Sequence, residues 1–291
     1  MKVILFGGRG YLGQQFLTIY PDALTPSTDI ADRSAVAEIL DREKPDVVIN
    51  CAGKTGRPNV DWCEDHKEET IHANVLGPLV LNEECSKRGV YWVHMSSGCI
   101  YEGDNEGKGF AEDNEPNFTG SFYSRSKIWS DQILSEFPVL ILRIRMPFDD
   151  SLHPRSLITK IAKYQKVLDV RNSLTYLPDF LQAAKTLIER RRTGIFNLVN
   201  PGVISPFEIM TLYKEIVDPS HVIERLTLDH LSDVVKAGRS NCTLSTAKAE
   251  KEGVTLRPVD EAVRTALAAI ARGKTESGAL ETDPSAEPVI C

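Results

Sequence analysis

A tyrosine and a lysine four residues apart have the types and spacing for acid-base chemistry. Tyr123 and Lys127 lie in a segment that predicts a helix, where this spacing puts both side chains on one face. A phenol has an ordinary pKa of about 10, and an adjacent cation lowers it by favouring the phenolate. Such a pair also occurs in purely structural helices, so the prediction depends on what accompanies it. Ser97 lies at the C-terminal end of a predicted strand, and its hydroxyl could bind a carbonyl oxygen that Tyr123 protonates while a cofactor gives hydride to the carbon.

Glycines that follow the first predicted strand indicate where that cofactor binds. Gly7, Gly10 and Gly13 stand at three-residue intervals, and their missing side chains permit a tight turn, close approach to a pyrophosphate and close helix packing. The alternative is a purely structural turn. The predicted cofactor contacts in this segment are Gly7, Arg9, Gly10, Tyr11, Leu12 and Gly13.

Arg9 lies inside this turn and bears on the choice of cofactor. No acidic residue stands clearly at the end of an obvious second strand, where an NAD-selective site would hold the ribose hydroxyls. Arg9 therefore favours NADPH, with a solvated surface arginine as the alternative. Asp29 is a candidate acid that keeps NADH possible.

Alternating apolar runs and helical segments must position these residues. Because the apolar runs lack the alternation of half-buried strands, they predict a parallel sheet covered by helices on both faces. The expected fold class is α/β, a Rossmann-type doubly wound parallel sheet with a small, mainly helical C-terminal substrate lobe. The predicted strands are 2–6, 47–50, 90–95, 139–144 and 195–199, and the predicted helices include one capped by Asp32, one over 64–87 and one over 122–136.

After Pro147 the alternation of predicted strands and helices becomes less regular, which predicts a second unit. We expect a dinucleotide-binding domain of residues 1–148 with 173–203, and a substrate-binding lobe of residues 149–172 with 204–272 made of helices and loops. The segment 273–291 is rich in Ser, Thr, Glu, Pro, Gly and Ala, which predicts a disordered tail.

Composition narrows the possible partners. The chain has 291 residues, a net charge of −7 and an isoelectric point near 5.5, which argues against nucleic acid. The first residues are too short an apolar run for a signal peptide, and no apolar run has the roughly 20 residues of a membrane helix, so a cytoplasmic enzyme is expected. The 6 cysteines form no close pair, which predicts free thiols and no metal site.

Beyond these motifs, residues 1–272 resemble the extended short-chain dehydrogenase/reductase family, and within it the dehydrorhamnose reductase group. Four stretches look like the bifunctional nucleotide-rhamnose synthase/epimerase-reductases of plants and some viruses: GRPNVDWCE at 56–64, GCI at 98–100, PNFTGSFYS at 116–124 and ITK at 158–160. The resemblance implies conversion of UDP-4-keto-6-deoxy-glucose to UDP-L-rhamnose, by epimerisation at C3 and C5 followed by reduction at C4 with NADPH. The nucleotide base is inherited from this resemblance, so dTDP and GDP forms stay open.

The same resemblance assigns the epimerisation residues. Cys99, two residues after Ser97, would be the base, as a cysteine is in the similar GDP-fucose synthases, and Lys160 would be its partner acid. Protons next to a ketone are acidic enough for a thiolate to remove one. His153 ranks second to Lys160. The alternatives are a small buried thiol and a solvated helix lysine.

Further contacts are carried over from the family. Ala52, Gly53, Lys54 and Pro147 are predicted to contact the cofactor together with Tyr123 and Lys127, Cys51 could simply pack, and Asn74 would support the catalytic helix. For Arg239 a surface salt bridge is the alternative to sugar-nucleotide binding. The predicted substrate contacts are Arg57, Asn59, Ser97, Gly98, Cys99, Tyr123 and Arg239.

Two other functions stay open. The chain could be a reductase only, acting on a 4-keto-rhamnose nucleotide made by another epimerase, or a non-catalytic NADP-binding regulatory subunit. The attached dehydratase region of many plant proteins has no counterpart here, so a separate 4,6-dehydratase is expected to supply the substrate. A homodimer is also expected.

Overall fold

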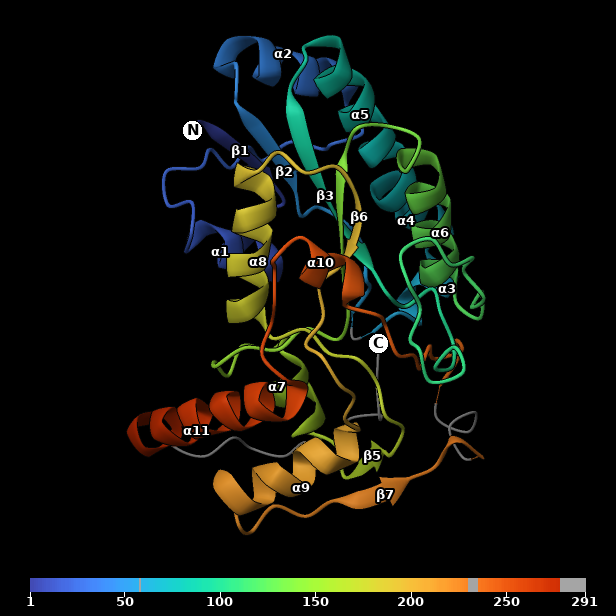
Figure 1. The fold of residues 1–291 in the computed structure, drawn as a ribbon, viewed down its shortest axis with the longest axis vertical. Helices are drawn as coiled ribbons and strands as arrows, with labels where there is room; N and C mark the ends of the chain where they lie inside the picture. The colour runs from blue at the N-terminus through green and yellow to red at the C-terminus, as the bar shows by residue number, and fades with distance from the viewer. Residues whose placement is uncertain (58, 230–234, 278–291) are drawn as a thin grey trace.

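A five-stranded parallel sheet forms the centre of the larger part of the molecule (Figure 1). The computed structural model describes residues 1–57, 59–229 and 235–277, with the backbone alone for 274–277. The predicted doubly wound α/β fold is confirmed. The strands, in their order across the sheet, are β1 (Val3–Phe6), β2 (Val47–Asn50), β3 (Tyr91–Ser97), β4 (Leu140–Ile144) and β6 (Gly194–Asn197).

Helices cover both faces of this sheet, which explains why its strands are continuously apolar. Leu5 and Ile49 pack toward α1 (Tyr11–Leu17) and α8 (Leu177–Glu189). Their neighbours Ile4 and Val48 point to the opposite face and its helices. Successive strand residues therefore face different cores, and both need apolar side chains. The helices of the second face are α2 (Arg33–Glu43), capped by Asp32 as predicted, α5 (Gly77–Lys87) and α6 (Phe122–Leu134).

The chain reverses its direction of travel across the sheet beside β1. After α1 it forms a single bridge between Leu24 and Ile4 on one side of β1, and after α2 it enters β2 on the other side. Pro21 and Pro26 flank the bridge, and proline cannot donate to a ladder, so no full second strand forms. The carboxyl ends of β1 and β2 thus border a topological switch point, where open sheets of this kind bind ligands.

The helix predicted over 64–87 is interrupted. Pro78 cannot donate a hydrogen bond to the carbonyl of Asn74, four residues earlier, which favours the wider π turn at this place. The prediction of one continuous helix was therefore wrong. The segment comprises α3 (Trp62–Asp65), α4 (Lys67–Ile71), the π-helix η1 (His72–Leu76) and α5.

A smaller unit with its own apolar core lies below the sheet in Figure 1. It contains a two-stranded parallel sheet, where only helices and loops were predicted. Strands of three residues are too short to give a periodic signal, which explains the error. The domain boundaries themselves stay a prediction. The unit comprises α7 (Leu157–Ile161), β5 (Lys166–Leu168), α9 (Pro206–Ile216), β7 (Glu224–Leu226) and α11 (Val259–Ser277), and α10 (Ala247–Lys251) packs back on the main sheet.

Helix α11 also corrects the predicted start of the tail. Residues 273–277, predicted to be disordered, end this helix, because its buried residues nucleate a helix that polar residues can extend. The remaining predicted tail, 278–291, lies outside the described residues. Among the helices described, we find none with both the length and the apolar character that crossing a bilayer requires.

Candidate active site

A cavity of about 380 Å³ lies at the carboxyl ends of the strands and receives most of the predicted site residues. It extends from the glycine turn after β1 to α7 of the smaller unit, so both parts of the molecule contribute to it. The predicted residues that line it are Arg9, Gly10, Tyr11, Leu12, Ala52, Gly53, Lys54, Arg57, Asn59, Ser97, Cys99, Tyr123, Lys127, Pro147 and Lys160.

The other predicted site residues, Gly7, Gly13, Gly98 and Arg239, are not among the lining residues. The three glycines lie where a side chain would collide with neighbouring atoms. At Gly7, with φ of +77°, a Cβ atom would come within 2.5 Å of the Ala52 nitrogen, and at Gly98 it would come equally close to Leu244. Their contribution in this structure is close packing beneath the cavity.

The glycine turn is built to approach a ligand closely. A Cβ on Gly13 would collide with the carbonyl of Gly7, so only glycine lets α1 begin this near the strand. Gly10 donates its N–H to the Gly7 oxygen at 2.9 Å and itself lines the cavity. A turn with exposed backbone groups at a switch point fits the pyrophosphate of a dinucleotide.

Arg9 and Asp29 are the candidate groups for binding the adenosine ribose of the cofactor, and their contacts beside the turn differ. The Arg9 guanidinium donates to the Ser27 hydroxyl at 2.8 Å. Asp29 instead accepts a hydrogen bond from the Ala31 N–H and pairs with His72 at 2.7 Å, and these bonds lower the pKa of its carboxyl group. Arg9 lines the cavity and has a neutral hydroxyl as its partner, whereas the carboxylate of Asp29 is paired with His72 and is not among the lining residues.

Strand β3 and helix α6 bring the predicted reductase residues together. Ser97 is the last residue of β3, and its hydroxyl accepts the Cys99 N–H at 3.1 Å. Tyr123 and Lys127 lie in the first turns of α6, whose N-cap Ser121 accepts the Ser124 N–H at 3.1 Å. All three predicted reductase side chains are buried and line the cavity.

The ammonium group of Lys127 is held inside the protein. It donates to the Met95 carbonyl at 3.0 Å, and burial lowers the pKa of Lys127, while the nearby Asp131 opposes that shift. Asp131 is bound by Arg143 at 2.9 Å and accepts the Ser96 hydroxyl at 2.5 Å. The buried carboxylate therefore has two partners and is fixed near the lysine.

Asn74 joins the loop after β2 to helix α6. Its side chain accepts the Lys54 N–H at 2.8 Å, donates to the Lys54 carbonyl at 2.9 Å and donates to the Ser126 hydroxyl of α6 at 3.1 Å. These contacts match the supporting role expected for it. Cys51 also lines the cavity, and burial raises the pKa of its thiol, which leaves it uncharged and apolar in character.

The predicted epimerisation residues face the same cavity from different elements. Cys99 follows β3, is 6% exposed and contacts the Arg145 guanidinium at 3.2 Å. Lys160 lies on α7 of the smaller unit. His153 also lines the cavity, where its ring stacks on Tyr11 at 4.4 Å between centroids. The structure thus brings Cys99 together with both candidate acids.

Cationic side chains give the cavity a charge suited to phosphate groups. Lys54, Arg57 and Arg155 line it together with Arg9. Arg155 also donates to the Gly56 carbonyl at 3.1 Å, and burial followed by repulsion from Arg57 lowers the pKa of its guanidinium. A diphosphate placed among these groups would neutralise them.

Arg239 forms a buried ion pair beside the cavity. It donates to both carboxylate oxygens of Asp61, at 2.7 and 2.9 Å, and lies 3.4 Å from the Asn59 side-chain oxygen. The salt bridge weighed as the alternative for Arg239 is therefore present, although buried. Burial raises the pKa of Asp61, but the hydrogen bonds from Arg239 and from the Ala237 N–H outweigh it and lower the pKa.

Sequence reasoning missed several residues at this site, and three of them have features that bear on its chemistry. Arg155 lines the cavity, and Arg145 contacts Cys99, which lines it. Met146 also lines the cavity with a φ of +43°, which is uncommon for a residue with a side chain. A signal existed for one of them: Arg143 and Arg145 interrupt the otherwise apolar end of a predicted strand. Charges at such a place indicate a buried polar network or a site.

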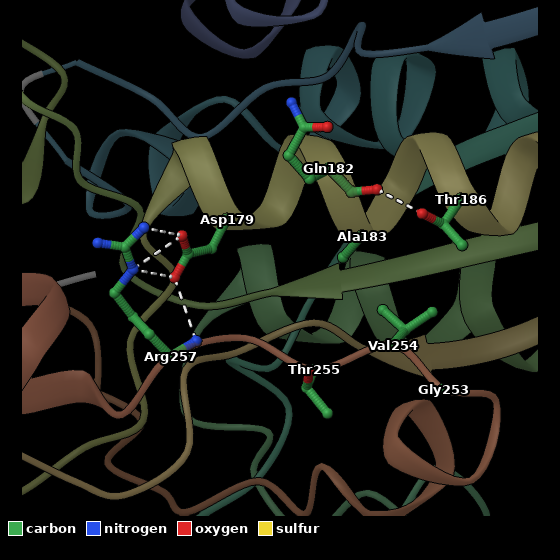
Figure 2. Close-up of a pocket in the computed structure, with 8 residues that line it drawn as sticks. All are labelled: Asp179, Gln182, Ala183, Thr186, Gly253, Val254, Thr255 and Arg257. Atoms are coloured by element: carbon green, nitrogen blue, oxygen red, sulfur yellow. Dashed lines mark hydrogen bonds and ion pairs between the residues drawn. The ribbon is translucent and has the colours of Figure 1, made fainter.

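A second cavity, of about 360 Å³, lies away from these residues, between α8 and the segment before α11. Figure 2 shows its lining, where Arg257 and Asp179 form a two-pronged ion pair and Thr186 bonds back to the Gln182 carbonyl. None of the predicted catalytic, cofactor or substrate residues lines it. The contacts of its lining residues indicate that this cavity is a junction between α8 and the segment before α11.

Comparisons with known proteins agree with this geometry. A bifunctional dTDP-4-dehydrorhamnose 3,5-epimerase/dTDP-4-dehydrorhamnose reductase from Arabidopsis thaliana is 42% identical over 241 residues, which cover 80% of each chain. A trifunctional UDP-glucose 4,6-dehydratase/UDP-4-keto-6-deoxy-D-glucose 3,5-epimerase/UDP-4-keto-L-rhamnose-reductase from the same plant is 41% identical over 80% of this chain. The match spans only 36% of that larger protein.

A solved structure is similar over almost its whole length. The UDP-rhamnose synthase from Acanthamoeba polyphaga mimivirus superposes with a TM-score of 0.88 and 32% identity, covering 92% of this chain and 99% of that one. The family model for the RmlD substrate binding domain matches residues 1–272, which include every predicted site residue. The chain therefore belongs to the RmlD substrate binding domain family.

Proposed function

We propose that this protein is a bifunctional enzyme that converts UDP-4-keto-6-deoxy-glucose to UDP-L-rhamnose. It epimerises C3 and C5 and then reduces the C4 ketone with NADPH. The observation that carries the proposal is that one cavity is lined by Ser97, Tyr123 and Lys127 and also by Cys99 and Lys160. The names of the two similar plant proteins support epimerisation and reduction of a nucleotide-linked keto sugar, with dTDP in one name and UDP in the other, and the name of the viral protein supports UDP-rhamnose as the product.

The reduction uses the residues of β3 and α6. NADPH, when bound along the glycine turn, supplies a hydride to C4 of the sugar. Ser97 donates a hydrogen bond to the C4 oxygen and orients the ketone, and Tyr123 delivers the proton to that oxygen. Lys127, whose charge lies within the same buried region, favours the phenolate that forms on Tyr123.

The epimerisation uses Cys99 and Lys160 on the same bound sugar. The Cys99 thiolate removes the proton at C5 or C3, and the electron pair of that bond forms an enolate with its charge on the C4 oxygen. Lys160 returns a proton to the carbon from the other face, the enolate collapses to the ketone, and exchange with water restores both side chains. Ser97 can stabilise the enolate oxygen as it stabilises the alkoxide in reduction.

The groups around the cavity support NADPH and a nucleotide diphosphate as its ligands. Arg9, positioned by Ser27, is the group for the 2′-phosphate, and the pairing of Asp29 with His72 disfavours a ribose contact typical of NADH. Arg57 and Arg155 are suited to the sugar-nucleotide diphosphate. A separate 4,6-dehydratase is the proposed source of the substrate.

The purified protein should oxidise NADPH in the presence of UDP-4-keto-6-deoxy-glucose and form the rhamnose nucleotide. In deuterium oxide, without another epimerase, deuterium should appear at C3 and C5. Product without deuterium at these positions would favour a reductase only, and NADPH binding with no turnover would favour a regulatory subunit. Substitution of dTDP for UDP in the same assay tests the choice of base.

The variant Cys99→Ser separates the two activities. It should abolish deuterium incorporation while largely retaining reduction of a pre-epimerised 4-keto-rhamnose nucleotide, because a hydroxyl is too weak an acid to serve as the base. Cys63→Ser, at a buried thiol outside the lining, is the matched control and should retain both activities. Equal loss of both activities in Cys99→Ser would contradict this division of roles.

We also propose a homodimer formed through α6. Trp129 and Ile133 are 39% and 40% exposed on this helix, and Phe137, just beyond it, is 41% exposed. Large apolar side chains grouped on the exposed side of a helix favour pairing. Light scattering should give a mass of about twice 32.3 kDa, and Trp129→Glu should lower it to that of a monomer.

A further inference from the structure

The arginine after strand β4 contacts the proposed epimerisation base. Arg145 lies directly after Ile144, the last residue of β4, so its side chain starts at the carboxyl edge of the sheet beside Ser97 and Cys99. Its Nη1 atom lies 3.2 Å from the Cys99 sulfur. Arg145 is fully buried, whereas Cys99 lines the cavity.

Two residues far away in the sequence, Asn172 and Ser240, fix the orientation of this guanidinium. Its Nε and Nη2 atoms donate to the Asn172 side-chain oxygen, and Nη2 also donates to the Ser240 carbonyl at 2.5 Å. Nη1 donates to the Ser240 hydroxyl at 3.2 Å, in addition to the sulfur. Ser240 is itself tied to the Tyr101 carbonyl at 2.6 Å. Because a planar guanidinium held at several atoms cannot turn away, the contact with sulfur is a built-in feature of the fold.

We propose that Arg145 is the positioning residue that keeps Cys99 as a thiolate and aims it at the substrate, which rests on the proposed epimerase function. A guanidinium stays charged at every working pH, and a permanent cation next to a thiol in a buried place favours the ionised form. Lys160 cannot serve both as that permanent cation and as the acid, because it gives up its proton in each cycle. Arg145 supplies the constant charge and leaves Lys160 free for proton transfer.

The pH dependence of Cys99 alkylation tests this directly, without substrate. The intact protein is pulsed with iodoacetamide across a pH series, and the labelled Cys99 peptide is quantified by mass spectrometry. In the wild type the midpoint should fall at least about one pH unit below the ordinary thiol value of about 8.5. Arg145→Met should raise the midpoint by at least about one pH unit, and Arg145→Lys, which restores the charge, should recover part of that shift.

Two comparisons separate this effect from a loss of structure. Arg143→Lys changes a buried arginine two residues away, which contacts Asp131 and Tyr101, and it should leave the Cys99 midpoint unchanged. Reduction of the pre-epimerised ketone by Arg145→Met reports whether that variant is folded. If Arg145→Met is not folded, the alkylation midpoints of Cys99 in the wild type and in Arg145→Lys test the role of Arg145 instead.

The outcomes distinguish this proposal from the enzyme's proposed function. A wild-type midpoint at or above the ordinary value, or a midpoint that Arg145→Met leaves unchanged, overturns the role of Arg145. A low midpoint that depends on Arg145, in a protein that incorporates no deuterium at C3 and C5, upholds the thiolate contact and instead refutes the epimerase function. A low midpoint together with a loss of deuterium incorporation in Arg145→Met supports both.

Discussion

At the scale of single residues, the site separates groups that change charge from groups that hold charge constant. Tyr123 and Lys160 are proposed to exchange protons with the substrate, whereas Arg145 and Arg143 are buried guanidinium groups that stay charged. Lys127 lies between these classes, because burial lowers its pKa while Asp131 opposes the shift. Among the groups proposed to transfer protons, Cys99 is in contact with a constant charge, the guanidinium of Arg145.

Replacing Tyr123 by phenylalanine should stop reduction and spare epimerisation. The variant keeps the ring and loses the hydroxyl that protonates the C4 oxygen, so the rate of reduction should fall by about 10²- to 10⁴-fold. Deuterium incorporation at C3 and C5, which depends on Cys99, should persist. Loss of incorporation in Tyr123→Phe would show that the tyrosine also serves the epimerisation.

The lowered pKa of Lys127 predicts how stability depends on pH. Between its folded pKa and its ordinary value of 10.5, the unfolded chain binds the proton that the folded chain has released. The free energy of unfolding contributed by Lys127 therefore rises with pH through this range and is lost as pH falls through the folded pKa. Urea unfolding of the wild type and Lys127→Met across alkaline pH measures the difference. A difference that does not vary with pH would contradict this assignment.

At the scale of the elements, the buried strands and their glycine turn were predictable because their signals are local. Strand β2 matches its predicted range of 47–50, and Asp32 caps α2 as expected. The break inside 64–87 was not predicted, since it depends on which carbonyl Pro78 leaves without a donor. The short strands β5 and β7 were also missed, because each needs the other, far away in sequence, to form a sheet.

The N-cap of α6 is expected to matter for both stability and catalysis. Ser121 accepts the Ser124 N–H, and this helix end carries Tyr123 and Lys127. Ser121→Ala should lower the free energy of unfolding by about 1 kcal/mol, the usual contribution of such a cap. Ser135→Ala, at the exposed other end of the helix, should change it by less than about 0.5 kcal/mol. Chemical denaturation measures the free energy of unfolding of both variants. Equal losses in the two variants would show that the Ser121 cap does not stabilise the helix.

At the scale of the whole molecule, the site depends on contacts between segments far apart in the sequence. The motifs predicted Ser97, Tyr123 and Lys127 because their chemistry follows from short spacings. Arg145 could not be assigned from spacing, since its partners Asn172 and Ser240 are brought to it only by folding. The same limit applies to Arg239, whose partner Asp61 lies 178 residues away.

The Asp61–Arg239 ion pair joins the loop beside the cavity to the segment that precedes Ser240, so it should control stability and substrate affinity together. The Arg239 side chain is 0% exposed and that of Asp61 is 19% exposed. Asp61→Asn leaves a buried guanidinium without its carboxylate, which should lower the free energy of unfolding by about 3 kcal/mol. The KM for the sugar nucleotide should rise because Asn59 and Arg239 lose their alignment.

At acidic pH the wild type should lose the stability that the Asp61–Arg239 ion pair contributes, whereas Asp61→Asn has no such contribution to lose. The folded pKa of Asp61 lies below its ordinary value of 3.8, so its stabilising contribution is complete above that value and disappears as pH falls through the folded pKa. Lys236→Ala removes an exposed pair with Asp65 in the same region and should change stability far less. Unfolding measured from neutral to acidic pH should show the curves of wild type and Asp61→Asn converging at the acidic end. Parallel curves would mean that the pair contributes through packing, with no dependence on the charge of Asp61.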